Sequence, residues 1–328
     1  MSRANISIFV PHLGCPHQCS FCNQKHITGC DEQPSANTVY DAVNNSIKSG
    51  QSHENCEIAF FGGSFTAIDR DYMLKLLIAA KDCVEKYGFH GIRISTRPDC
   101  IDSDILAILK NYKVTSIELG AQSMDNNVLL FNERGHTADD VRISSKLIKE
   151  FGFELGLQMM TGLYKSNEET DFYTANELIK LSPKTIRIYP TITLKNTSLE
   201  DLYLEGKYIP DDLEKSAKLC SKLSEMFEQA NIKVIRLGLH TLDADSYVAG
   251  PWHPAFGELC ESYRFRNIIE NIVEPDCSYK IHVNPSDVSK VIGQKRSNII
   301  YFKNKNVSLS IIQDETVEKR TVLVEEVR

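Results

Sequence analysis

The sequence predicts an α/β fold, a partial barrel of parallel strands followed by a small α+β appendage. Three observations carry this prediction. Short strands rich in β-branched and apolar residues alternate with helices of about ten or more residues, which is the pattern of a parallel sheet. Six or seven such units follow one another, which favours a barrel or partial barrel over a short open sheet. The 328 residues, of which 42% are hydrophobic and 25% charged, suffice for a sizeable core.

Recognisable start and stop residues bound the strand–helix units. Asp102 is expected to cap the third helix, and Thr137 with Asp140 forms a variant of the capping box before the fourth. Gly88 is expected to end the second helix. The expected strands are 5–10, 56–61, 91–96, 114–119, 153–160, 185–189 and 233–237. The expected helices are 37–48, 72–87, 103–111, 137–151, 168–181 and 213–229.

The strand–helix rhythm ends at about residue 245, before a loop with two prolines at 250–254. We therefore expect a core over 1–245, a linker and helical extension over 246–278, and a small α+β unit over 279–328. The elements expected after the loop are a helix at 258–272, a strand at 279–283, helices at 286–292 and 297–302, a strand at 308–312 and a final stretch at 320–327.

Charge and hydropathy exclude several classes of protein. The formal net charge of −7 argues against a surface that binds polyanions everywhere. No apolar run approaches the length of a membrane span, and the first residues lack the pattern of a secretory signal. We therefore expect a cytoplasmic protein with no membrane partner, in which most of the ten cysteines are free thiols.

A cluster of cysteines directly after the first expected strand is the exception. Its members, in the spacing C-x3-C-x2-C, are Cys15, Cys19 and Cys22. Three thiolates on one short loop can hold three irons of a 4Fe-4S cubane and leave the fourth iron without a protein ligand. The alternative is a structural zinc site, with His12, His17 or His26 as fourth ligand. Zinc knuckles usually come in pairs, and no second knuckle is evident in the sequence.

Further motifs stand where the other expected strands end. Gly62, Gly63 and Ser64 follow the second strand, where glycines permit a close approach of the backbone to a ligand. The others are the runs 95–99, 117–123, 134–137, 157–163 and 186–191. In barrels of this kind the chemistry lies at the carboxyl ends of the strands, so these motifs are expected to share one site.

Together these motifs resemble those of radical S-adenosylmethionine (SAM) enzymes. The resemblance implies a partial (β/α)6-type TIM barrel, a 4Fe-4S cluster on Cys15, Cys19 and Cys22, and SAM bound at the open iron. It also implies a radical mechanism, in which an electron cleaves SAM into methionine and a 5′-deoxyadenosyl radical. The electron would come from a donor such as flavodoxin or ferredoxin.

The resemblance also assigns roles to individual residues. Gly62, Gly63 and Ser64 would meet the SAM amine, and Arg134 would pair with the SAM carboxylate, the alternative being a solvated arginine at a helix start. Glu118 and Gln122 would contact the ribose or the methionine of SAM, and Gln158 would contact the ribose hydroxyls. The substrate mouth would be lined by Arg97 and Tyr189.

Within this superfamily the chain resembles the radical SAM core of the Elongator catalytic subunit and the oxygen-independent coproporphyrinogen oxidase-like proteins. The likeness covers about residues 5–240 and is densest in the strings RGHTADDV, QMMTGL, IRIYPT and LYLEGKY. It implies modification of tRNA, although too few residues follow the core for Elongator's acetyltransferase domain. Alternatives are an enzyme for a small molecule or tetrapyrrole, and a noncatalytic RNA-binding protein with a structural metal.

The appendage carries a local reversal of charge. Residues 280–306 hold six Lys or Arg against one acid, Asp287. The string VIGQKRSNI resembles the GxxG loop of a KH domain, with Arg296 in place of the second glycine. Lys295 and Arg296 are therefore candidate RNA contacts; the alternative is a capping unit with a solvated basic face. A second metal on Cys100, Cys260 and Cys277 is less favoured than buried thiols, and His136, His240 and His253 are expected to be structural.

Overall fold

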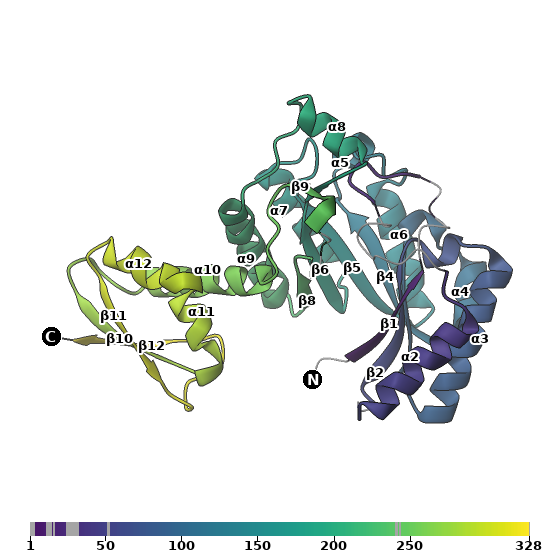
Figure 1. The fold of residues 1–328 in the computed structure, drawn as a ribbon, viewed down its shortest axis with the longest axis horizontal. Coiled ribbons are helices and arrows are strands. Elements are labelled where there is room, and N and C mark those ends of the chain that lie inside the picture. Colours follow the sequence, from purple (N-terminus) through teal and green to yellow (C-terminus); the bar gives the residue numbers. More distant parts are fainter. Residues whose placement is uncertain are drawn as a thin grey trace.

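A seven-stranded parallel sheet, curled into a half-barrel, forms the larger part of the molecule (Figure 1). The computed structural model describes residues 4–10, 15, 17–23, 33–50, 53–239, 242 and 244–327. The strand order is β1-β2-β3-β4-β5-β6-β8, and every neighbouring pair is parallel. The strands are β1 Ala4–Val10, β2 Cys56–Gly62, β3 Gly91–Thr96, β4 Val114–Gln122, β5 Glu154–Thr161, β6 Thr185–Pro190 and β8 Lys233–Leu237. The predicted partial barrel is confirmed.

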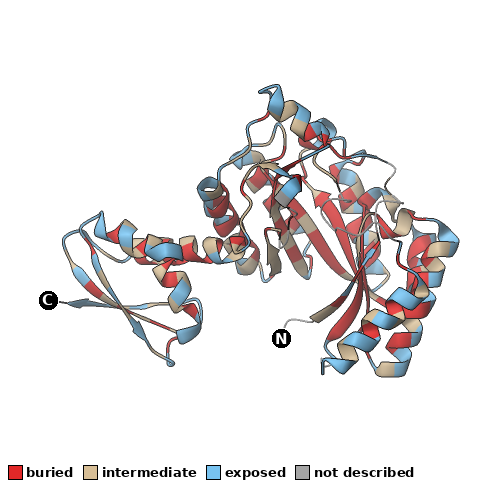
Figure 2. Cartoon of the chain, viewed as in Figure 1, coloured by how far each residue is buried: buried red, intermediate tan, exposed pale blue. Residues whose placement is uncertain are grey.

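Helices cover the convex face of this sheet. They are α2 Ala36–Lys48, α3 Arg70–Tyr87, α4 Ser103–Asn111, α6 Ala138–Glu150, α7 Glu168–Lys180 and α9 Leu213–Gln229. Alternate strand residues such as Ile94, Ile117 and Ile188 are buried in the core between sheet and helices, which Figure 2 shows in red. The side chains between them therefore point to the concave face. Asp102 and the Thr137–Asp140 capping box hold their helix starts as predicted.

Short elements complete the carboxyl edge of the sheet. Helices α5 Asn126–Phe131 and α8 Ser198–Leu204 lie there, together with a ribbon in which β7 Thr193–Leu194 pairs with β9 Tyr247–Ala249. The sequence analysis did not predict these elements, because two to seven residues are too few to display a hydrophobic period.

Helix α10, Phe256–Glu270, joins the barrel to the appendage and belongs to both cores. Phe256 and Cys260 lie in the barrel core, whereas Phe265 and Ile269 lie in the core of the appendage. The appendage elements are β10 Ser278–Val283, α11 Val288–Ile292, α12 Ser297–Lys303, β11 Ser308–Gln313 and β12 Leu323–Val327. They form a mixed sheet of order β11-β10-β12, in which β11 is parallel and β12 antiparallel to β10. The domain boundaries stay a prediction.

None of the helices in the described part of the chain has both the length and the apolar character needed to cross a membrane.

A buried carboxyl group beneath the β5 end makes stability depend on pH. Asp171 in α7 accepts a hydrogen bond from the Gly162 amide (3.1 Å), and burial raises its pKa from 3.8 to about 7. Between about pH 4 and pH 7 the folded chain therefore holds a proton that the unfolded chain has released, so stability falls as pH rises through this window and is flat above it.

We expect Asp171→Asn to flatten this dependence, because the amide can still accept from Gly162 but does not ionise. Urea unfolding at about pH 5 and about pH 8 measures the effect. The stability of the variant relative to the wild type should be greater at the higher pH than at the lower pH. Equal pH slopes for both proteins would show that Asp171 ionises normally.

Candidate active site

The three clustered cysteines lie at the carboxyl edge, beside the ends of β2 and β4. Cys15 Sγ is 3.6 Å from Ser64 Oγ, and the buried Cys19 Sγ is 3.0 Å from Arg134 Nη1. The Cys22 amide donates to the Cys19 carbonyl (3.0 Å), so these two cysteines share one turn. Two of the candidate zinc ligands, His12 and His26, lie outside the described residues. His240, which was expected to be structural, also lies outside them.

Buried polar contacts fix the cysteine turn to the barrel. Ser20 Oγ donates to Asn132 Oδ1 (3.0 Å), and the Ser20 amide donates to the Asn132 carbonyl (3.2 Å). Asn132 is fully buried and its amide nitrogen donates to two further carbonyls. Gly135 has φ +70°, and a Cβ there would lie 2.2 Å from the His17 ring. The turn therefore packs closely on the segment that carries Arg134.

Two buried guanidinium groups face Cys19. Arg134 donates to the Gly120 carbonyl through Nη2 (2.6 Å) and to Cys19 Sγ through Nη1. Arg97 Nη1 is 3.9 Å from the same sulfur, and its other nitrogens donate to both oxygens of Asp99. Burial opposes the charge of Arg97, but Asp99 and Cys19 raise its pKa above the usual value. The site therefore supplies two cations where a thiolate would be negative.

The exposed fractions of these two arginines bear on the roles expected of them. Arg134 is 5% exposed, which excludes the solvated arginine considered above. Arg97 is 4% exposed and also donates to the Arg134 carbonyl. Asp99 and the Arg134 carbonyl therefore hold the Arg97 guanidinium within the protein, and its expected substrate contact stays a prediction.

The remaining cofactor candidates surround this turn. A Cβ at Gly62 would lie 2.4 Å from the Val10 carbonyl, so only glycine fits where β1 and β2 end together. The Gly63 amide donates to that carbonyl (3.2 Å). Gln122 holds φ 63°, a strained conformation at the end of β4, and its side chain lies with that of Arg134 over Gly120. Gln122 Oε1 and Arg134 Nε are both buried and have no hydrogen-bond partner among the described residues.

These observations fit a bound anionic cofactor. Three thiols lie at one edge with compensating cations, and an unpartnered buried donor and acceptor lie beside them. Buried polar atoms are nearly always hydrogen-bonded, so the two orphaned atoms point to a ligand that completes the site.

Glu118 and Gln158 lie lower on the concave face, in a ladder of charges across five strands. Glu118 is fully buried and accepts from Arg187 Nε (2.9 Å) and from the Gln158 amide, and Arg93 Nη1 is 3.6 Å away. Arg93 in turn bonds Glu57 through Nε (2.9 Å) and Nη2 (2.8 Å). Both predicted cofactor residues are therefore already engaged with side chains of the barrel. The sequence shows these polar residues within apolar strands but not their pairing.

Above the charge ladder, the concave face presents aromatic rings and a cation. Phe9 is 41% exposed, and its ring centroid is 6.4 Å from that of Phe61. The Arg187 guanidinium lies 5.0 Å from the Phe61 ring centroid, and its Nη1 is 3.4 Å from Tyr189 Oη. Tyr189 therefore lies on the concave face beside Arg187, a partner that sequence reasoning missed, and its role at the substrate mouth stays a prediction.

Other candidates lie away from the site or are structural. Cys260 is buried in the barrel core and Cys277 packs on the appendage core, so Cys100, Cys260 and Cys277 form no common site. Burial, with Arg134 nearby, lowers the pKa of His136 to about 4, and this neutral ring bonds the Ala121 carbonyl, as expected for a structural histidine. Lys295 and Arg296 lie in the appendage, outside the barrel.

The half-barrel carries three cysteines and two buried arginines at its carboxyl edge, and comparison with known families identifies the class of enzyme. Residues 9–175 match the Radical SAM superfamily and residues 183–265 its Radical_SAM C-terminal domain, so the chain belongs to the radical SAM superfamily. It is a SAM-dependent enzyme whose cofactors are a 4Fe-4S cluster and SAM. This family membership argues against a structural zinc site on the three cysteines.

The chain is similar to Elongator-type proteins within this superfamily, as predicted. It is 24% identical to the tRNA uridine(34) acetyltransferase of Dehalococcoides mccartyi, over 62% of this chain and 52% of that protein. It is 31% identical to the Elongator complex protein 3 of Homo sapiens, over 50% of this chain and 34% of that protein. The chain thus spans about a third to a half of these curated relatives.

A solved structure shows the same fold. The archaeal Elp3 of Methanocaldococcus infernus, with an N-terminal deletion, aligns with a TM-score of 0.68 at 20% identity. The alignment covers 81% of this chain and 64% of that chain.

Proposed function

We propose that this radical SAM enzyme modifies RNA, with tRNA as its substrate. The observation that carries the proposal is the concave face, on which Phe9, Phe61, Tyr189 and Arg187 lie below the cysteine turn. Aromatic rings and arginine planes are the surfaces on which unpaired bases stack, at about 1–3 kcal/mol per base. Relatives named tRNA uridine(34) acetyltransferases support the same class of substrate.

The cofactors would be held at the carboxyl edge. Cys15, Cys19 and Cys22 would hold the cluster, which would supply the electron for the reductive cleavage of SAM. Arg97 and Arg134 offset the negative charge of the thiolates, as neighbouring hydrogen-bond donors do in other metal sites.

SAM would lie between the cysteine turn and the ends of β2 and β4. Ser64 and the tight Gly62–Gly63 corner border its methionyl end. The unpartnered Arg134 Nε donates to its carboxylate, and Gln122 Oε1 accepts from its polar groups. Glu118 and Gln158 lie below this site, where the Glu118 carboxylate accepts hydrogen bonds from both Gln158 and Arg187.

The base to be modified would occupy the concave face. Enzymes that act on a base take it out of its stack into a pocket, where aromatic side chains replace the lost stacking. Phe9 and Phe61 offer that surface, and Arg187 places a cation beside it.

The test combines SAM cleavage with analysis of nucleosides. The protein is reconstituted with iron and sulfide without oxygen, reduced with dithionite or reduced flavodoxin, and given tRNA from cells that lack the gene. We expect 5′-deoxyadenosine and a tRNA nucleoside of changed mass.

Phe61→Leu tests the role of the ring. It should retain SAM cleavage without RNA but lose roughly tenfold or more of the nucleoside product, because stacking is lost. The matched control is Phe131→Leu, an exposed ring on α5, which should keep full activity. Formation of 5′-deoxyadenosine with no change in any tRNA nucleoside would contradict an RNA substrate.

A further inference from the structure

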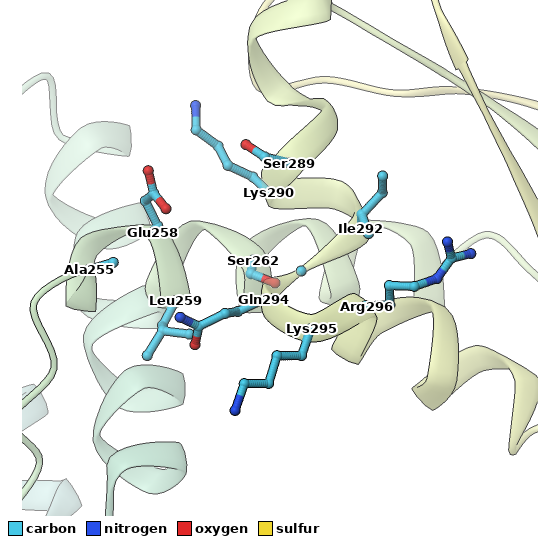
Figure 3. A pocket seen from close by; sticks show the side chains of 11 residues that line it. Ala255, Glu258, Leu259, Ser262, Ser289, Lys290, Ile292, Gln294, Lys295 and Arg296 are labelled. Atoms are coloured by element: carbon cyan, nitrogen blue, oxygen red, sulfur yellow. The ribbon is translucent and has the colours of Figure 1, made fainter.

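A hollow of about 340 Å³ lies between α10, α11 and the turn that joins α11 to α12 (Figure 3). Two serines, Ser262 and Ser289, offer hydroxyl groups to it, and three cations border it. Figure 3 shows Lys290 on one side of the hollow, and Lys295 and Arg296 reaching outward from the turn. One acid, Glu258, is among the residues that line it.

The turn is held in one conformation against α10. Gly293 has φ +75°, and a Cβ there would lie 2.4 Å from Ser297 Oγ and 2.8 Å from Ser262 Oγ. The fully buried Asn298 donates to the Ser262 carbonyl (2.9 Å) and the Val291 carbonyl (3.0 Å), and accepts from Arg266 Nε (2.8 Å). The fold therefore presents this turn in a fixed shape.

The turn places two cations in strained backbone positions. Lys295 (φ 51°) and Arg296 (φ 62°) are both left-handed, a conformation that favours glycine and costs roughly 1 kcal/mol or more for other residues. A glycine at position 296, as in the GxxG loop, would remove part of that cost. Strained backbone positions cluster at binding sites, where the surrounding structure holds them in place.

The same two cations have no acidic partner among the described residues. Lys280, Lys290 and Lys305 are paired with Glu325, Asp287 and Glu270. Lys295, Arg296 and Lys303 form no such pair in the described ranges, and all three are exposed. Unpaired cations on a chain of net charge −7 create a local positive field that attracts a polyanion to this place.

We propose that this turn and hollow form the site that grips the phosphodiester backbone of the substrate RNA, an inference that rests on the proposed RNA substrate. Lys295 and Arg296 bind phosphates, and the hydroxyls of Ser262 and Ser289 supply further donors in the hollow. Gln294 contacts His253 (3.3 Å between Nε2 atoms), in the segment that leads from β9 at the carboxyl edge to α10. This one short segment therefore links the turn that would hold the RNA to the carboxyl edge of the barrel.

The test measures tRNA affinity of the full chain by fluorescence anisotropy at several salt concentrations. Lys295→Glu/Arg296→Glu should weaken binding roughly tenfold or more and reduce the slope of log affinity against log salt by about two. Lys295→Gln/Arg296→Gly should also weaken binding, and because its glycine suits the backbone at position 296, added strain at that position would not explain the loss. The matched control, Lys146→Glu/Lys222→Glu, makes the same change of net charge on exposed helix positions and should bind normally.

SAM cleavage without RNA is the second readout and should be unchanged in all variants. Normal tRNA binding by both turn variants, equal weakening in the control, or equally tight turn-dependent binding of poly-glutamate would each overturn the inference. Turn-dependent RNA binding by a wild-type enzyme that alters no tRNA nucleoside would support this site and contradict the proposed function instead.

Discussion

Cys19→Ala is expected to abolish both cluster assembly and SAM cleavage, the largest effect on activity among the changes considered. Cys19 is the buried member of the three cysteines, and both Arg134 and Arg97 direct a guanidinium nitrogen at its sulfur. A cubane with only two thiolates on this turn would be poorly held. Iron and sulfide content, the absorption band of the cluster and 5′-deoxyadenosine production should all fall to background after anaerobic reconstitution.

The fold should survive this change, because Arg97 keeps Asp99, Arg134 keeps the Gly120 carbonyl, and Ser20 keeps Asn132. Cys277→Ala is the matched control: it removes a thiol from the appendage and should leave iron content and SAM cleavage unchanged. If Cys19→Ala retains its cluster, Cys19 is not a ligand. Burial, Asp99 and the nearby Cys15 raise the pKa of the Cys100 thiol, and Cys100 would then be the first alternative to test.

Local patterns in the sequence predicted the barrel well, because its elements depend on local chemistry. The seven strands and their helices follow from hydrophobic period and capping residues, such as Asp102 and the Thr137–Asp140 pair. The ribbon β7–β9 depends on pairing between residues more than fifty positions apart, which no local pattern displays. That residues from several loops lie at one edge of the sheet was predictable, because parallel strands end at the same edge.

The partners of the site residues were less predictable. Glu118 was expected at the cofactor, yet its carboxylate is bound by Arg187 and Gln158 on β6 and β5. Those contacts follow from register, which pairs Gln158 with Arg187 across the strands, and register is set by the whole sheet. Arg97 was expected at an open mouth, but Asp99, two residues on, binds its guanidinium within the protein.

The charge ladder makes Glu118 a decisive residue for stability. Its carboxylate lies between two guanidinium groups, those of Arg187 and Arg93, and is inaccessible to solvent. Burial alone would lower the pKa of Arg187, but Glu118 and Tyr189 raise it above its usual value, so the cation depends on this acid. Removing one partner of a buried ion pair leaves an uncompensated charge in the interior, which costs about 3–5 kcal/mol.

Glu118→Gln should therefore lower the free energy of unfolding by about 3–5 kcal/mol, although the side chain keeps its shape. Urea unfolding of the apoprotein at about pH 7.5 measures this without any contribution from bound SAM. Glu150→Gln is the matched control, since it breaks an exposed pair with Lys146 (3.7 Å) and should change stability by about 0.5 kcal/mol or less. A Glu118→Gln protein as stable as the wild type, but with weakened SAM binding, would instead return Glu118 to the cofactor role that the sequence analysis expected.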